Sequence, residues 1–401
     1  MKIISWEAIF ATIVVFIILL VFPIIFQLDF LDPIQNTFQD FHSTDIVFSQ
    51  FRNDSKIPVD SNIVLVNIGE LSRKDIARQI EIINRYNPKV IGIDCIFKKK
   101  LSEDTDSSFE NVLLNSKNVV LVEQLTDFNR EKNYYDSSMK PIERFSRHCR
   151  VGHCNLLLDE QTSTVRTFKP KLSLLNRKIP AFSVLIAKEL SPEAAKAFLN
   201  REEDYEIINF KRNADKYITL DWDDVLENRS KLALVKNRIV LMGFLGPKIN
   251  TNVTEDIFFT SMNSKFVGKT YPDMYGLVIH ANIVSMILEG TFCYKTPFWL
   301  SIFFAFLICY FNMLLFGYIK RKSDELFEPL GLVITFSELI LTYVVIIYVF
   351  YYFKLELDIA GDFFTILMCA TSFEIYDDSL KPLWMKISNK YKLSRIEHKT
   401  K

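Results

Sequence analysis

The chain has 401 residues, with 48 basic and 48 acidic side chains, so its formal net charge at pH 7 is zero. This balance argues against a protein that binds nucleic acid through a basic face. Hydrophobic residues make up 49% of the chain and 35 residues are Phe, which excludes a disordered protein. Because 24% of the residues are also charged, we expect a polar globular part joined to membrane-spanning segments.

Residues 6–26 form the first long apolar segment, in which only Glu7 and Thr12 are polar. About 20 apolar residues are enough to cross a bilayer as a helix. A cleaved signal peptide is the alternative. We favour an uncleaved anchor over residues 1–27, because the stretch is longer than a usual signal sequence and bulky, acidic residues follow it.

The next segments alternate between strand and helix patterns. Short apolar runs at 62–68 and 90–97 flank residues 72–86, where Ile recurs at helical spacing, and this predicts a parallel strand–helix–strand unit. The fold class expected is an α/β domain with a mostly parallel sheet and an antiparallel edge hairpin. The other elements expected are strands at 119–124, 205–210 and 238–243, a hairpin at 151–169, and helices at 109–114, 180–190, from 191, at 220–228 and at 275–288.

Three more apolar segments follow, at 297–318, 330–353 and 359–376, the last one interrupted by acidic residues near its ends. Basic residues gather directly after the first of these three and in the C-terminal tail. Since basic loops stay in the cytoplasm, four spans place both termini inside and the large domain outside a bacterial inner membrane. The organisation expected is an anchor (1–27), an extracytoplasmic domain (28–296), three spans (297–377) and a cytoplasmic tail (378–401).

Eight short segments between residues 45 and 290 occur in a recognisable order. They are NIVLVNIGE (62–70), NPKVIGIDCIF (87–97), VGHCNLLLDEQTSTVR (151–166), INF (208–210), YITLDWDDVL (217–226), RIVLMGFLGP (238–247), EDIFFT (255–260) and YGLVIHANIVSMIL (275–288). Their order, with the flanking spans, resembles the second type of CHASE domain, the cyclase- and histidine-kinase-associated sensory extracellular family.

This resemblance implies an extracytoplasmic sensor whose membrane helices pass a signal to a cytoplasmic kinase or cyclase. The tail of 24 residues is far shorter than a catalytic domain, so we expect the output to lie in a separate cytoplasmic or membrane effector protein. An unknown extracytoplasmic ligand and a homo-oligomer are the other partners considered. A second hypothesis is a structural subunit of a cell-envelope complex that uses the sensor domain as a scaffold.

Acidic residues end two of the expected strands, Glu70 after 62–68 and Asp94 within 90–97. Ligands bind beyond the carboxyl ends of parallel strands, so both are candidates for contact with a cation or polar ligand. Alternatively, they cap the following helices or pair with Arg. On the expected hairpin, His153 and Arg166 are further ligand candidates, and edge-strand or hairpin stabilisation is the alternative.

Asp256 follows a glycine-containing loop that lacks the Lys-Ser/Thr ending of a phosphate-binding loop, so it is expected to fix the loop or line a pocket. His280 lies on the last helix before the second span, either as a packed histidine or as a ligand or pH contact. Glu338 lies inside the third span, where a carboxyl group is costly and faces other helices. We expect it to bond Asn312 of the second span and to serve packing or helix coupling.

The sequence HCRVGHC at 148–154 repeats a His-Cys pair. The spacing matches no standard zinc site, so a disulfide between Cys149 and Cys154 and no special role both stay open. We expect no metal and no cofactor. No Ser/His/Asp order, paired-acid motif or metal-binding helix signature stands out, so the chain is not expected to be an enzyme.

Overall fold

The computed structural model describes residues 6–26, 42–52, 54–159, 162–227, 229–251, 253–263, 271–357 and 359–386. The chain divides into two units. One is Thr44–Cys293, called here the α/β unit. The other combines Met1–Ser43 with Tyr294–Lys401 and is called the helical unit. The expected boundary between anchor and domain at 27–28 and the basic tail beyond residue 386 lie outside the described residues.

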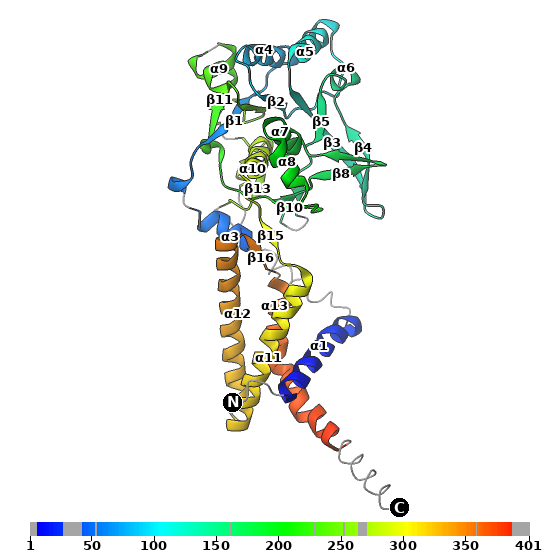
Figure 1. Ribbon diagram of the computed structural model, residues 1–401, viewed down its shortest axis with the longest axis vertical. Coiled ribbons are helices and arrows are strands. Elements are labelled where there is room, and N and C mark those ends of the chain that lie inside the picture. Colours follow the sequence, from blue (N-terminus) through cyan, green and yellow to red (C-terminus); the bar gives the residue numbers. More distant parts are fainter. Residues whose placement is uncertain are drawn as a thin grey trace, which may run out of the picture. The chain divides into compact units, whose positions relative to one another are not determined.

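Among the described residues, a nine-stranded sheet forms the centre of the α/β unit (Figure 1). Six strands run parallel in the order β11–β1–β12–β2–β3–β5. The second half of β3 pairs antiparallel with β4, and the β8–β9 hairpin extends this side. The expected α/β class, mostly parallel with an antiparallel edge, is confirmed. The strands are β1 (Asp60–Asn67), β2 (Val90–Ile93), β3 (Val119–Asn129), β4 (Tyr134–Met139), β5 (Arg150–His153), β8 (Lys171–Leu174), β9 (Arg177–Pro180), β11 (Tyr217–Leu220) and β12 (Ile239–Gly243).

Helices cover both faces of this sheet (Figure 1). On one face, alternate strand residues such as Val64, Ile93 and Leu121 pack against Ile80 of α4 and Phe109 of α5. On the other face, α7 contacts β2 and β5, while α10 contacts β1 and β12. Burial on both faces explains why these strands are continuous apolar runs. The helices are α3 (Ser43–Gln50), α4 (Arg73–Asn84), α5 (Glu103–Asn115), α6 (Glu143–Ser146), α7 (Phe182–Leu190), α8 (Pro192–Leu199), α9 (Trp222–Leu226) and α10 (Gly276–Glu289).

A second sheet of five strands is built around β7. The hairpin expected over 151–169 is half correct, because β7 does pair antiparallel with β6. Its first half is wrong: β5 instead pairs in parallel with β3 of the main sheet, where Val151 packs against the core. The strands are β6 (Leu157–Leu158), β7 (Thr164–Phe168), β10 (Glu206–Ile207), β13 (Ile257–Thr260) and β14 (Met274–Tyr275).

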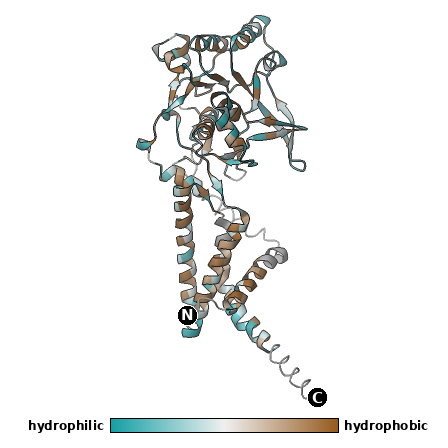
Figure 2. Cartoon of the chain, viewed as in Figure 1, coloured by the Kyte–Doolittle hydropathy of each residue, from teal (hydrophilic) through white to brown (hydrophobic). Residues whose placement is uncertain are grey.

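The helical unit contains apolar helices that share one core, which includes Ala11, Met313, Phe327 and Phe373. In the part of the chain described, two helices, α11 and α12, are long and apolar enough to cross a membrane. Figure 2, coloured by the hydropathy of each residue, shows that hydrophobic residues recur along both helices. α1 is 21 residues long and α13 is 16 residues long. The elements are α1 (Trp6–Phe26), β15 (Tyr294–Lys295), α11 (Phe298–Lys322), α12 (Phe327–Phe353), β16 (Leu355–Glu356), α13 (Ile359–Glu374) and a π-helix (Ile375–Leu380).

Gly152 provides a test of the packing between β5 and α7. A Cβ atom added there would lie 2.9 Å from both the backbone N and the Cα of Phe182, which cannot rotate away. We expect Gly152→Ala to lower the free energy of unfolding by about 1–3 kcal/mol, as overpacked cores do. Thermal melting of the solubilised full chain measures the change.

Gly331→Ala is the matched control, since its added Cβ would lie 4.0 Å from the nearest neighbour, the Cβ of Ala370. Equal melting temperatures for Gly152→Ala and the unmodified chain would contradict the close β5–α7 contact.

Candidate functional site

Asn67 holds together the loops at the carboxyl edge of the parallel strands. Its side chain is fully buried, and its Nδ2 donates to Asp221 Oδ1 at 2.9 Å and to the carbonyl of Gly246 at 3.0 Å. Its Oδ1 accepts from the N–H groups of Gly69 at 3.0 Å and Leu245 at 2.9 Å. Asn67 is not among the residues predicted from the sequence, although an Asn at the end of an apolar strand was a usable signal.

Asp94 follows β2 at the same edge. Its N–H donates to the carbonyl of Met242 at 2.8 Å. A Cβ atom added to Gly243 would lie 3.3 Å from the Asp94 Cβ and 2.8 Å from Leu277 Cδ1 on α10. Asp94 therefore lies beside the first turn of α10. Burial raises the pKa of its carboxyl group to about 6.

Asp256 reaches the same turn from the other side of the loop. Its carbonyl accepts from the N–H of Gly276 at 3.1 Å, and its Oδ1 would lie 3.3 Å from a Cβ added there. Its φ of +54° is in the left-handed region, which Asp tolerates better than most residues. Although Asp256 is an exposed residue, desolvation of its carboxyl group and then the charge of Asp94 raise its pKa to about 7.

Asp94 and Asp256 both border the first turn of α10, and the charge of Asp94 contributes to the raised pKa of Asp256. In the part of the chain that the structure describes, neither side chain has a hydrogen-bond donor or a cation as partner. The alternative that Asp94 caps the following helix does not apply, because Ser102 caps α5. Two carboxylates without a countercharge are suited to a cation, a hydrogen-bond donor or a proton.

Helix α10 is buried from Gly276 to Ile287, so its polar side chains need partners. Asn282 Oδ1 accepts from the N–H groups of Lys211 at 3.1 Å and Arg212 at 3.0 Å. Ser285 Oγ donates to Asp60 Oδ2, on β1, at 2.6 Å. These bonds fix α10 against two other segments of the α/β unit.

His280 provides the third such contact. Its Nδ1 lies 2.9 Å from Ser183 Oγ on α7, and its ring lies edge-on to Phe182. Burial lowers the pKa of His280 to about 4, and a hydrogen bond to the backbone of Cys154 partly offsets this. The ring is therefore neutral at pH 7 and bonded inside the fold, as expected for a packed histidine.

His153 ends β5 and is 1% exposed. No hydrogen bond of normal geometry reaches either ring nitrogen from the described residues. Burial and then His280 lower the pKa of His153 to about 3, while the nearby backbone of Lys169 raises it slightly. His153 is therefore a neutral core residue at pH 7, at the end of β5 and directly before Cys154.

Arg166 is fully engaged within the α/β unit. It binds Asp45 of α3 through two branches, at 3.0 Å from Nε to Oδ1 and 2.6 Å from Nη2 to Oδ2. Its Nη1 donates to Thr162 Oγ1 at 2.8 Å. Both members of the ion pair are buried, with 7% and 1% of the side chains exposed. Arg166 therefore joins β7 to α3, and the sequence could not show this partner 121 positions away.

Glu70 lies in the turn after β1 and is exposed. Within the described ranges, its side chain makes no hydrogen bond or ion pair, and Ser72 rather than Glu70 caps α4. The structure does not bring Glu70 into the group formed by Asp94 and Asp256.

In the helical unit, Asn312 Nδ2 of α11 donates to Glu338 Oε2 of α12 at 2.8 Å. The hydrogen bond expected between these two helices is present. Its role in coupling the helices stays a prediction.

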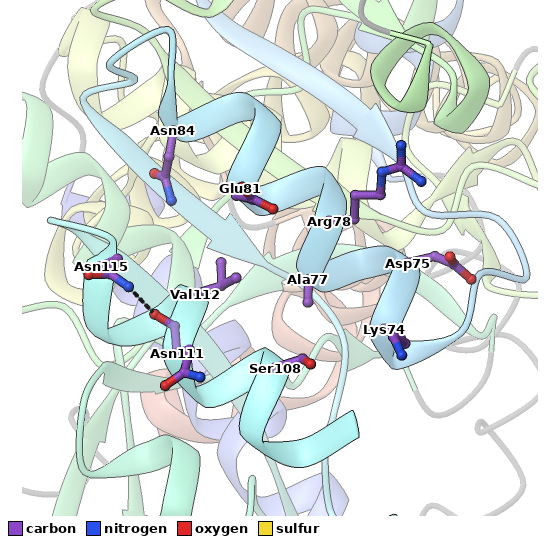
Figure 3. Close-up of a pocket in the computed structure, with 10 residues that line it drawn as sticks. All are labelled: Lys74, Asp75, Ala77, Arg78, Glu81, Asn84, Ser108, Asn111, Val112 and Asn115. Atoms are coloured by element: carbon purple, nitrogen blue, oxygen red, sulfur yellow. Dashed lines mark hydrogen bonds between the residues drawn. The ribbon is translucent and has the colours of Figure 1, made fainter. Parts of the chain in front are cut away.

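Cys149 and Cys154 are both free thiols, so the disulfide considered between them is not formed. The described residues contain no group of three or more His, Cys, Asp or Glu side chains arranged to hold a metal ion. A groove of about 570 Å³ lies elsewhere, between α4 and α5, with Ala77 and Val112 at its centre and polar residues around them (Figure 3). It includes none of the ligand-binding candidates.

The parallel sheet, its helix-covered faces and the apolar helices define an α/β domain joined to membrane-type helices. The chain matches the family model described as the CHASE2 domain over residues 12–319. The protein therefore belongs to the CHASE2 family, whose domains are extracellular sensors. No curated protein and no solved structure matches the chain.

The ion pair of Arg166 and Asp45 predicts non-additive effects on stability. Arg166→Met alone leaves a buried carboxylate without its partner and is expected to cost about 3–5 kcal/mol of unfolding free energy. The double variant Arg166→Met with Asp45→Leu removes both charges, and we expect it to recover at least half of this loss. Denaturant unfolding of the full chain measures both values, and simple additivity would contradict the pairing.

The raised pKa of Asp94 predicts that removing its charge stabilises the fold by an amount that depends on pH. Because the pKa rises from 3.8 to about 6 on folding, the native state binds more protons than the unfolded chain between these values, and stability falls as the pH rises through this window. Asp94→Asn should raise the melting temperature at pH 8 by a few degrees, since each kcal/mol corresponds to roughly 2–4 °C at this size. The gain should shrink below pH 6 and vanish near pH 4; a gain that does not vary with pH would contradict the raised pKa.

Proposed function

We propose that the chain is a membrane-anchored sensor that binds a ligand or protein outside the cytoplasmic membrane of a bacterium and signals to a separate partner. Membership of the CHASE2 family supports the sensory role. We propose no catalytic step and no cofactor in this role. The partner is a cytoplasmic or membrane effector protein, and nucleic acid is not among the proposed partners, in line with the zero net charge.

The proposed topology has four spans, α1, α11, α12 and α13, with both termini in the cytoplasm. Its support is the length and apolarity of α11 and α12 and the core that all four helices share. Lys320, Arg321 and Lys322 at the end of α11 favour a cytoplasmic position for that end.

The proposed ligand contact is the pair Asp94 and Asp256, and this pair is the observation on which the proposal depends most. Ionised carboxylates that are partly desolvated and lack a countercharge gain from a positively charged or hydrogen-bond-donating group. Both lie against the first turn of α10. A change at the pair therefore acts on the helix that precedes α11 in the chain.

The second candidate function is a structural or interaction subunit of a cell-envelope complex. The observation that favours it is that Arg166 and His280, two of the predicted ligand contacts, are bonded inside the fold. In that case, charge changes at Asp94 and Asp256 leave the interactions of the protein unaltered.

The two functions differ in a capture experiment from membranes. Full-length protein carrying Asp94→Asn with Asp256→Asn mimics an occupied, neutralised pair. A sensor is expected to change the amount of its captured cytoplasmic partner at least threefold in this variant. Quantitative mass spectrometry of the purified complex measures the change.

The control variant, Glu193→Gln with Glu203→Gln, removes the same charge from exposed positions of the α/β unit. It should leave capture unchanged. Equal capture by the acid-pair variant and the unmodified chain would contradict the sensor and favour the scaffold.

A further inference from the structure

The connection between α12 and α13 is part of a strand pair. Its residues Leu355–Glu356 form β16, which pairs in parallel with β15, Tyr294–Lys295 (Figure 1). The N–H of Tyr294 donates to the carbonyl of Lys354 at 2.8 Å. Thr296 then donates twice to the carbonyl of Glu356, from its N–H at 2.9 Å and from its Oγ1 at 2.8 Å.

β15 lies in the segment that connects the α/β unit to α11. β15 begins at the residue after Cys293, where the α/β unit ends, and it precedes α11. A side-chain contact adds a further connection, since His42 Nδ1 lies 3.8 Å from Glu356 Oε1. Three segments that are far apart in sequence thus meet at Glu356. They are the segment at His42, the residues directly before α11, and the link between α12 and α13.

A parallel pair of two residues is not stable alone, so its ends must be fixed by other contacts. At one end, Lys354 has a left-handed φ of +54° and its N–H closes the last turn of α12 on Phe350 at 2.9 Å. At the other end, Pro297 follows Thr296 directly and is the N-cap residue of α11. Helices on both sides therefore hold the two strands in register, and the strands in turn hold the helix ends.

We propose that residues 294–296 and 354–356 form a clamp that ties the α12–α13 connection to the segment leaving the α/β unit. A displacement of residues 294–296 then reaches α12 and α13 through backbone hydrogen bonds as well as α11 through the chain. In this proposal, α12 and α13 move in response to the segment that leaves the α/β unit. The inference deepens the proposed function, because it assigns the path by which a signal from α10 enters the helical unit.

The test is hydrogen exchange of the full chain in lipid nanodiscs. Thr296→Pro removes the N–H and the hydroxyl that bind Glu356. We expect amide exchange at residues 350–357, on the other side of the clamp, to rise at least tenfold. Thr296→Val is the matched control, which keeps the N–H and loses only the hydroxyl bond, and its exchange there should stay within threefold of the unmodified chain.

A disulfide variant guards against general unfolding of the proline variant. Lys295 and Glu356 lie directly opposite in the pair, so Lys295→Cys with Glu356→Cys should cross-link and restore protection at 350–357 in the Thr296→Pro chain. Unchanged exchange in Thr296→Pro, or failure of the cysteines to cross-link, would overturn the clamp. This readout needs no ligand or partner, so a failed clamp and a failed sensor role are distinguished.

Discussion

The structure of the α/β unit depends on the burial of α10. A helix that is enclosed from Gly276 to Ile287 has to satisfy each polar side chain inside the protein. His280 forms a hydrogen bond with α7. Asn282 forms one with the backbone of Arg212, and Ser285 forms one with Asp60 of β1. Each bond has a different partner segment, so the helix cannot shift or rotate without breaking at least one of them. Its orientation is therefore specified rather than merely favoured by apolar packing.

The fixed orientation of α10 matters for Asp94 and Asp256, because both lie at its first turn. Asp94 and Asp256 lie at the start of α10, where Gly243 and Gly276 allow close approach. Desolvation raises the pKa of both carboxyl groups, and the charge of Asp94 adds to the rise at Asp256. Neutralisation of these carboxyl groups changes the electrostatic interactions at the first turn of α10. We propose that this firmly bonded helix passes such a change toward its other end, from which the chain continues into the helical unit.

Sequence patterns predicted the centre of the fold well, since buried parallel strands such as β1 and β12 are continuous apolar runs. They missed β4 and β9, which have no buried residue, and β8, which buries Leu172 and Leu174 but is only four residues long. Asp94 and Asp256 could be named as candidates because strand ends and loops after buried strands are recognisable positions in a sequence. Asn67, and Asp45 as the partner of Arg166, were missed, because their roles arise from contacts over more than a hundred residues of sequence.

We infer that the charge state of Asp94 and Asp256 affects α10 along its whole length. Hydrogen exchange of α10 amides, compared at one pH between the unmodified chain and Asp94→Asn with Asp256→Asn, tests it most directly. We expect altered exchange from the first turn of α10 to Glu289 and on to residues 294–296. A difference confined to the neighbourhoods of residues 94 and 256, with unchanged exchange through the rest of α10, would contradict it.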